Sequence, residues 1–178
     1  SATDLGAMPH LYGFFADEIY YRIDRRVRRV LCELALYDID GRRVAVDLLR
    51  PDEAKRVIQV GSDAGFLTDI DDGALDIHPL LRVFLESKLT EENPRAVNRI
   101  VARAVENLIQ HKLWDAAFEL IQRFSAESVL IKLLEAASDD LLAAGRTPTL
   151  RSWISDASDT EPIVQLIAAE LAFREGRF

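Results

Sequence analysis

"LDIHPLLRVFLESKL", residues 75–89, decides how the first half of the chain is interpreted. Apolar and polar residues alternate up to His78-Pro79, and an apolar helix pattern begins directly after them. Proline fits the first turn of a helix, because the backbone N–H that it lacks would have no partner inside the helix there. The chain has three histidines, so a histidine at this junction either caps the helix or serves a function that the rest of the chain must define.

The residues before this junction predict helices. Residues 10–23 and 24–37 have helical periodicity, with Asp24 as the N-cap of the second helix, and a third helix begins at Pro51. Between them, "DIDGRRVAVDLL" at 38–49 contains an Asp-Gly pair and several β-branched residues. We expect a turn there, followed by a short extended stretch.

A β-hairpin is predicted next. Apolar and polar residues alternate over 66–70 and again over 74–77, on either side of Asp72-Gly73. An Asp-Gly pair between two alternating segments is the strongest short-range signal for a hairpin turn. Helices followed by a hairpin and one more helix form a winged-helix arrangement, so we expect a winged-helix domain over residues 24–91.

The acidic balance of the chain limits its partners. The net charge is −8 and the sequence pI is near 4.9, which argues against a nucleic-acid footprint over the whole surface. The predicted helix at 24–37 and the residues before it hold one basic cluster, consisting of Arg22, Arg25, Arg26, Arg28 and Arg29. Apolar residues take the other side of this helix, and Glu33 is placed to pair with Arg29. The cluster is either a solvated or interdomain face or a face that contacts DNA.

The single cysteine, Cys32, excludes an internal disulfide and is predicted to be buried on a helix. A single cysteine without a disulfide partner fits a protein of a reducing compartment. The sequence has no apolar run of about 18 residues and no signal-peptide pattern, so we expect no membrane association and a cytoplasmic location.

From residue 92 onward only helical patterns remain. They predict antiparallel helical hairpins over 92–178, with turns at His111-Lys112, Gly145-Arg146 and Gly176-Arg177. These turns are spaced by 34 and 31 residues, close to the ~34-residue period of tetratricopeptide repeats. Three alanines are expected to let paired helices approach closely: Ala104, Ala117 and Ala143.

The predicted fold class is therefore mainly α, with a winged helix followed by a superhelical arm of tetratricopeptide-like hairpins. The third hairpin lacks its second helix, which would leave an apolar face uncovered. We therefore expect the arm to be truncated, and residues 1–23 to be a linker helix from an upstream domain.

The motifs of enzyme chemistry are missing from the sequence. There is no phosphate loop and no G-x-G-x-x-G motif, and "GSDAG" at 61–65 does not have the order of a nucleophile elbow. The histidines are far apart and none has a neighbouring ligand at metal spacing, while "DIDDG" at 69–73 breaks the order of a calcium loop. We predict no catalytic residue, no metal site and no cofactor within the chain itself.

Four stretches, taken in order, resemble one family. They are "RIDRRVRRVLCELALYDI" at 22–39, "HPLLRVFL" at 78–85, "KLWDAAFEL" at 112–120 and "TLRSWISD" at 149–156. This ordered set resembles the middle of the maltose-regulator-type, LuxR-family transcriptional activators, which belong to the signal-transduction ATPase (STAND) group. The match is loose over "DGRRVAVDLLRPDEAKRVIQV", residues 40–60.

The resemblance implies a role in signal transduction. An upstream nucleotide-binding domain in cis would hold ATP or ADP, and domains outside this chain would bind DNA. In the group, a histidine at the end of the wing contacts the β-phosphate of ADP in the closed, inactive state, and His78 matches that place. A helix N-terminus suits a phosphate. Arg82 either supports the phosphate or pairs with a carboxylate such as Glu86.

The helical repeats would then receive an unknown inducer or a partner protein. Trp114, Phe118 and Trp153 either line a binding surface on the repeats or belong to their core.

Two other functions remain open from the residues alone. The winged helix could itself bind DNA through residues 52–63, although this stretch offers only Lys55, Arg56 and Gln59 against three acidic residues. Alternatively, the repeats could be a protein-binding scaffold with no nucleotide involved.

Overall fold

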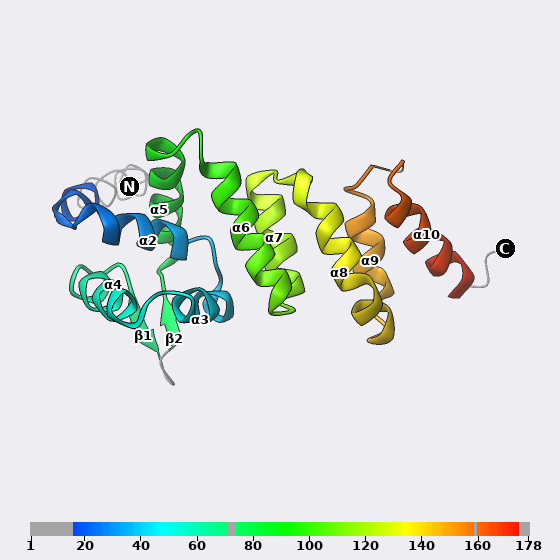
Figure 1. Ribbon diagram of the computed structural model, residues 1–178, viewed down its shortest axis with the longest axis horizontal. Coiled ribbons are helices and arrows are strands. Elements are labelled where there is room, and N and C mark those ends of the chain that lie inside the picture. Colours follow the sequence, from blue (N-terminus) through cyan, green and yellow to red (C-terminus); the bar gives the residue numbers. More distant parts are fainter. Residues whose placement is uncertain (1–15, 71–73, 159, 175–178) are drawn as a thin grey trace, which may run out of the picture. The chain divides into compact units, whose positions relative to one another are not determined.

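The computed structural model describes residues 16–70, 74–158 and 160–174. Over these residues the chain is mainly helical with one small antiparallel sheet, which confirms the predicted fold class at that level (Figure 1). It divides into two compact units after Val97. No helix among the described residues is both long enough and apolar enough to cross a membrane.

The first unit contains a helix at residues 16–22, followed by four more helices and a hairpin. Their bounds are α2 Arg25–Leu34, α3 Ile39–Asp47, α4 Pro51–Asp63, β1 Thr68–Ile70, β2 Ala74–Asp76 and α5 Pro79–Glu92. The helix α2 packs against both α4 and α5, and α3 packs against β2. Leu31, Phe66 and Leu85 are among the fully buried side chains of this core.

The predicted starts of α2 and α4 are confirmed, whereas α2 ends at Leu34 and not at residue 37. The Asp24 side chain accepts a hydrogen bond from the Arg26 backbone N–H at 3.0 Å, as an N-cap does, and α4 begins at Pro51. The apolar face of α2 is buried, and Arg29 on the opposite face pairs with Glu33 at 3.7 Å. The predicted helix 10–23 is described only from residue 16, and its part before that lies outside the described residues.

The hairpin is confirmed in its strands. Thr68 pairs with Asp76 and Ile70 with Ala74 in antiparallel register. The predicted turn at Asp72-Gly73 lies outside the described residues.

The expectation of a turn and an extended stretch at 38–49 was wrong, because the segment forms the helix α3. The Asp38 side chain accepts a hydrogen bond from the Gly41 backbone N–H at 2.8 Å, so Asp38 acts as an N-cap rather than as part of a turn. Gly41 and Arg42 are buried inside this helix. Ala45, one turn after Gly41, is buried as well, and α3 packs against α2, α4 and β2.

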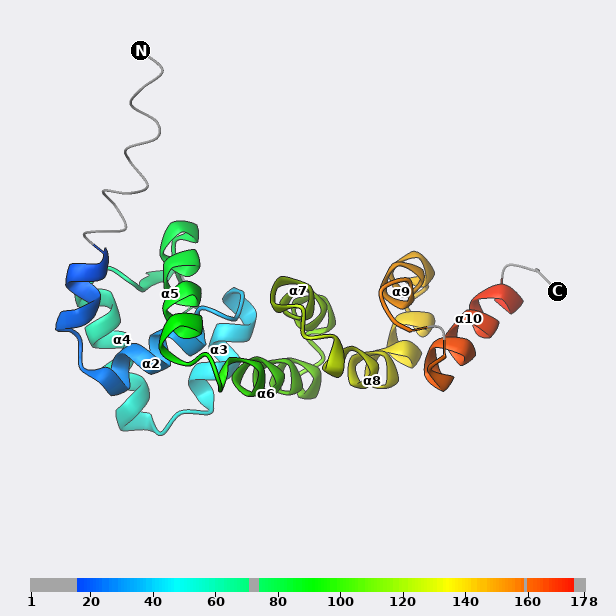
Figure 2. The ribbon, with the colours of Figure 1, turned by 90° about the horizontal axis from the view of Figure 1, so that it is seen from above.

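The second unit is built from consecutive helices. Their bounds are α6 Val97–Gln110, α7 Trp114–Phe124, the short 3₁₀ helix η2 Glu127–Val129, α8 Leu130–Ala143, α9 Thr147–Ile154 and α10 Pro162–Arg174. Within this unit α6 and α8 form one row and α7 and α9 a second row (Figure 2). Contacts run from α7 to α8, from α8 to α9, and from α10 to both α8 and α9.

Three helices of this unit end in the same way. Lys112, Ser125 and Gly145 have φ angles of 56°, 50° and 71°. In each case the next residue donates its N–H to the carbonyl five positions earlier, as Leu113 does to Leu108 at 2.9 Å and Arg146 to Leu141 at 2.8 Å. The predicted turns at 111–112 and 145–146 are therefore present, and that at 176–177 lies outside the described residues.

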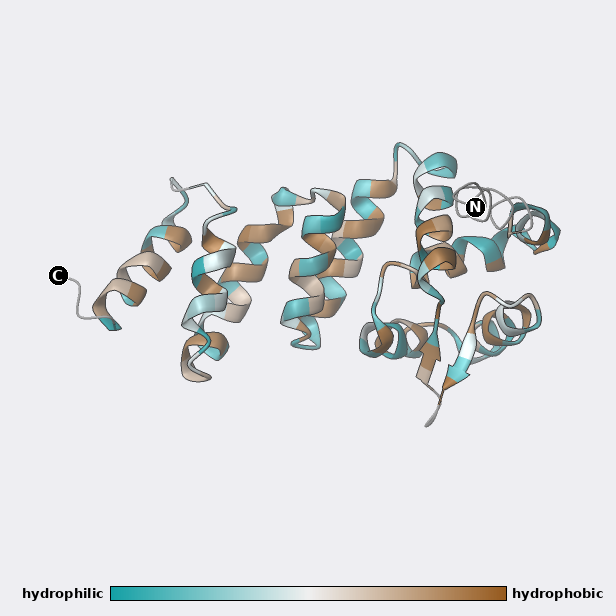
Figure 3. Ribbon diagram, turned by 180° about the vertical axis from the view of Figure 1, so that it is seen from behind, coloured by the Kyte–Doolittle hydropathy of each residue, from teal (hydrophilic) through white to brown (hydrophobic). Residues whose placement is uncertain are grey.

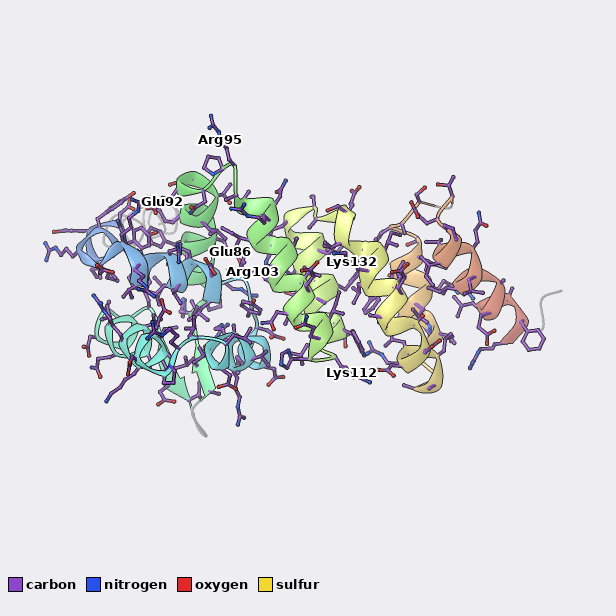
Figure 4. All side chains as sticks on the ribbon, viewed as in Figure 1. Glu86, Glu92, Arg95, Arg103, Lys112 and Lys132 are labelled. Carbon is purple, nitrogen blue, oxygen red and sulfur yellow. The ribbon has the colours of Figure 1, made fainter. Side chains whose placement is uncertain are left out.

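Ion pairs connect α8 with α6 and with the turn that follows α6. Lys112 pairs with Asp140 at 2.9 Å, and Lys132 pairs with Glu106 at 2.5 Å (Figure 4 labels both lysines). Because these pairs are exposed, each contributes at most about 1 kcal/mol.

Buried alanines also lie between these helices. Ala104 and Ala117 are buried as expected. Ala143 is exposed, so the expectation for this residue was wrong, and Ala137, nearly two turns earlier on α8, is buried instead.

Candidate functional site

His78 is the N-cap of α5. Its Nδ1 accepts a hydrogen bond from the Leu80 backbone N–H at 3.3 Å, and Pro79 occupies the first helical position. The residue is exposed. Because Nδ1 is an acceptor here, the neutral imidazole carries its proton on Nε2. The cap function therefore uses one ring nitrogen and leaves the other as a hydrogen-bond donor.

Two apolar side chains beside His78 are exposed. Leu80 is 51% exposed and Val83 is 63% exposed. They lie three residues apart and so share one face of α5, while Leu81 and Leu85 on the opposite face are buried. We call His78, Leu80 and Val83 the α5 patch. Exposed apolar residues are ordinary on protein surfaces, and the α5 patch combines two of them with a hydrogen-bond donor that the cap does not use.

Arg82 is committed to the fold. Its Nε donates to the Ala35 carbonyl oxygen at 3.0 Å and lies 3.4 Å from a Glu86 carboxylate oxygen. The predicted pair with Glu86 is thus confirmed. These contacts hold α5 against the end of α2, so the guanidinium supports the position of α5 rather than facing solvent as a free phosphate ligand.

Arg42, which sequence reasoning did not single out, fixes the strand before His78. Its guanidinium is 2% exposed and donates to the carbonyl oxygens of Tyr37 at 3.1 Å and Leu75 at 2.5 Å. It also lies 3.3 Å from an Asp76 carboxylate oxygen. Burial lowers the pKa of Arg42, and the hydrogen bond to Asp76 opposes that shift. Arg42 thus ties the end of β2, two residues before His78, to the Tyr37 carbonyl oxygen.

A groove lies beside this junction. It is lined by Asp38, Ile39, Asp40, Arg42, Asp76, Ile77, Pro79 and Arg82. Both arginines already have partners, and three carboxylates accompany them. An anion would therefore be repelled from the groove, and the exposed Nε2 side of His78 is the better place for it.

Cys32 is buried, as predicted. Its Sγ lies 3.3 Å from the Tyr20 hydroxyl oxygen, and burial raises the pKa of the thiol to about 11. A thiol held in its neutral form is a poor nucleophile. Cys32 is therefore part of the core and not of a reactive site.

The helix considered for DNA contact has few free donors. Arg56 pairs with Asp24 at 3.8 Å, and the Gln59 amide donates to the Asp63 carboxylate at 3.0 Å. On the adjoining helix, Arg26 donates to Glu53 at 2.8 Å and lowers the pKa of that carboxyl. These internal pairs make the surface a weak candidate for major-groove recognition.

Of the three aromatic residues considered for a binding surface, Trp153 belongs to the core of the second unit. The rings of Phe118 and Trp153 stack with centroids 4.7 Å apart, and Trp153 is only 4% exposed. Trp114 and Phe118 are half-buried. Stacking in the core therefore accounts for Phe118 and Trp153, and little of the Trp153 surface is exposed to contact a ligand.

Comparisons with known proteins add no assignment to this geometry. No protein-family model, no curated protein and no solved structure matches the chain. Within the described part of the chain, no three metal-ligating side chains lie close enough to hold an ion.

Proposed function

We propose that this chain is the regulatory relay of a multidomain, ATP-dependent transcriptional regulator of the maltose-regulator type. In this proposal residues 24–91 are a winged helix that relays nucleotide state, and residues 92–178 are tetratricopeptide-like repeats that receive an inducer or a partner protein. The order of helices and hairpin in the first unit, with its 68–76 register, supports the first assignment. The repeated helix ends at Lys112 and Gly145 support the second.

The α5 patch is the observation that carries the proposal. A cap histidine whose Nδ1 is occupied and whose Nε2 is free can stabilise the helix and donate to a phosphate oxygen at the same time. The exposed Leu80 and Val83 give a neighbouring domain an apolar surface on which to dock. Arg42 and Arg82 hold this patch in place from inside the unit.

The mechanism is a shift between two populations. In the closed state the upstream domain, with ADP bound, would dock on the α5 patch, and His78 would donate to the nucleotide phosphate. In the open state, with ATP, that contact would be lost. Binding of an inducer to the repeats would favour the open state to the extent that its affinity for the two states differs. The chain itself would perform no catalysis.

The proposal is tested first on the whole gene product that contains this chain. Its reading frame should encode a phosphate loop before residue 24 and a DNA-binding helix-turn-helix elsewhere, and the purified protein should carry adenine nucleotide when its acid extract is separated by chromatography. A gene product with neither the loop nor bound nucleotide would contradict the proposal. A protein-binding scaffold would then be the better account of the repeats.

A further inference from the structure

A small pocket lies between α2 and α4 in the first unit. Val27 of α2 and Val57 of α4 are buried in its lining, and the rest of the lining is charged, with three arginines and two carboxylates. Figure 3 colours both helices with hydrophilic as well as hydrophobic residues. The volume of about 200 Å³ is below the about 300–1,000 Å³ of typical small-molecule sites, so the pocket suits a single side chain of a partner.

Two of the three arginines keep donors that a ligand can use. Arg26 is committed, because it donates to Glu53 at 2.8 Å. Arg56 lies 3.8 Å from an Asp24 carboxylate oxygen, which is too far for a hydrogen bond. Arg50, the exposed N-cap residue of α4, has no ion pair within the described part of the chain. The donors of Arg50 and Arg56 are therefore available at the mouth of the pocket.

The electrostatic field at this place stabilises a carboxylate. The hydrogen bond from Arg26 lowers the pKa of Glu53, and the charges of Arg29 and Arg50 act in the same direction. This holds although the whole chain carries a net charge of −8. Asp52, the second carboxylate of the lining, opposes an incoming anion, so it should reduce the affinity without abolishing it.

We propose that the α2–α4 pocket binds a glutamate or aspartate side chain from an acidic segment of a partner protein. Arg50 and Arg56 donate to its carboxylate oxygens in charge-assisted hydrogen bonds. A single carboxylate side chain reaches between the acidic residues of this face, whereas the continuous phosphate backbone of a nucleic acid would lie against them. The inference goes beyond the proposed function, because neither His78 nor a nucleotide takes part in it.

The experiment uses a fluorescein-labelled short peptide of alternating glutamate and glycine. Its affinity for the 178-residue chain is measured by fluorescence anisotropy at low ionic strength. Arg50→Glu should weaken binding at least about tenfold, because it removes a donor and adds a like charge. Asp52→Asn should strengthen binding about threefold, because it removes the opposing charge. The matched controls are Arg43→Glu and Asp47→Asn at exposed positions of α3, which change the net charge equally and should bind like the wild type.

Three outcomes would overturn the inference. Equal affinity of Arg50→Glu and Arg43→Glu would show that the peptide does not use the pocket. A gain in affinity cannot come from misfolding, so equal affinity of Asp52→Asn and Asp47→Asn would contradict the charge assignment independently. If a labelled DNA duplex binds more tightly than the peptide and Arg50→Glu abolishes this binding, the face contacts nucleic acid instead. None of these results bears on nucleotide retention, so the two proposals fail separately.

Discussion

Replacing Arg42 with methionine tests whether this buried guanidinium holds the hairpin that leads to His78. Methionine replaces the methylene stem of arginine with an apolar side chain of similar length but removes the donors to the Tyr37 and Leu75 carbonyl oxygens. Each buried acceptor that loses its donor costs about 1–3 kcal/mol, so for the two carbonyls we expect a loss of about 2–6 kcal/mol in the free energy of unfolding. Loss of the ion pair with Asp76 adds little to this destabilisation, because the Asp76 side chain is 41% exposed.

Urea titration can assign this loss to the first unit. Both tryptophans of the chain, Trp114 and Trp153, lie in the second unit, so their fluorescence follows that unit, while circular dichroism follows both. Arg42→Met should lower the urea midpoint of part of the dichroism signal and leave the tryptophan transition in place. The matched control is Arg43→Met at the exposed neighbouring position, which should change stability by less than about 0.5 kcal/mol. If the two variants are equally stable, the reasoning about Arg42 is refuted.

Three further predictions concern other positions. Burial raises the pKa of Cys32 to about 11, so the thiol's contribution to stability is complete below its ordinary pKa and is lost as pH rises through about 11. The free energy of unfolding should therefore fall less over this pH range in Cys32→Ala than in the wild type. An equal fall in both proteins would refute this prediction. Ser125→Gly should raise the free energy of unfolding by about 0.5–1 kcal/mol in urea titration, because φ is 50° there, and an unchanged value would count against strain at this turn. Gly61→Ala should lower the free energy of unfolding by about 1–3 kcal/mol, because the added Cβ would lie 2.6 Å from Leu67 Cδ1. Ser62→Ala, on the exposed side of α4, should change the free energy of unfolding very little. Equal stability of the two variants would contradict the crowding at Gly61.

Local chemistry made much of the first unit predictable. Asp24 and Pro51 mark helix starts because capping and the missing proline N–H act over a few residues. The alternation of apolar and polar residues on either side of Asp72-Gly73 located both strands. Alternating burial is seen only in β2, where Leu75 is buried, whereas β1 is exposed throughout. His78 was found from the helix-start signal, because Pro79 marks the start of the helix that His78 caps.

Contacts distant in sequence made the rest unpredictable. The helix α3 was missed because Asp40-Gly41 looks like a turn, while the hydrogen bond from Arg42 to Leu75, 33 residues away, leaves no local signal. For the same reason the sequence could not separate a binding surface from a core at Trp153, whose burial depends on its stacking with Phe118.

The most direct test of the central claim is the dissociation rate of ADP from the whole gene product carrying His78→Ser. Serine can still cap α5 but lacks the Nε2 donor, so the variant separates the cap from the phosphate contact. The matched control is His111→Ser, at an exposed histidine of the second unit. The account predicts that ADP leaves His78→Ser at least about tenfold faster than the wild type, with His111→Ser unchanged, as expected for the loss of one charge-assisted hydrogen bond. Equal dissociation rates for His78→Ser and the wild type would show that His78 is a helix cap and no more.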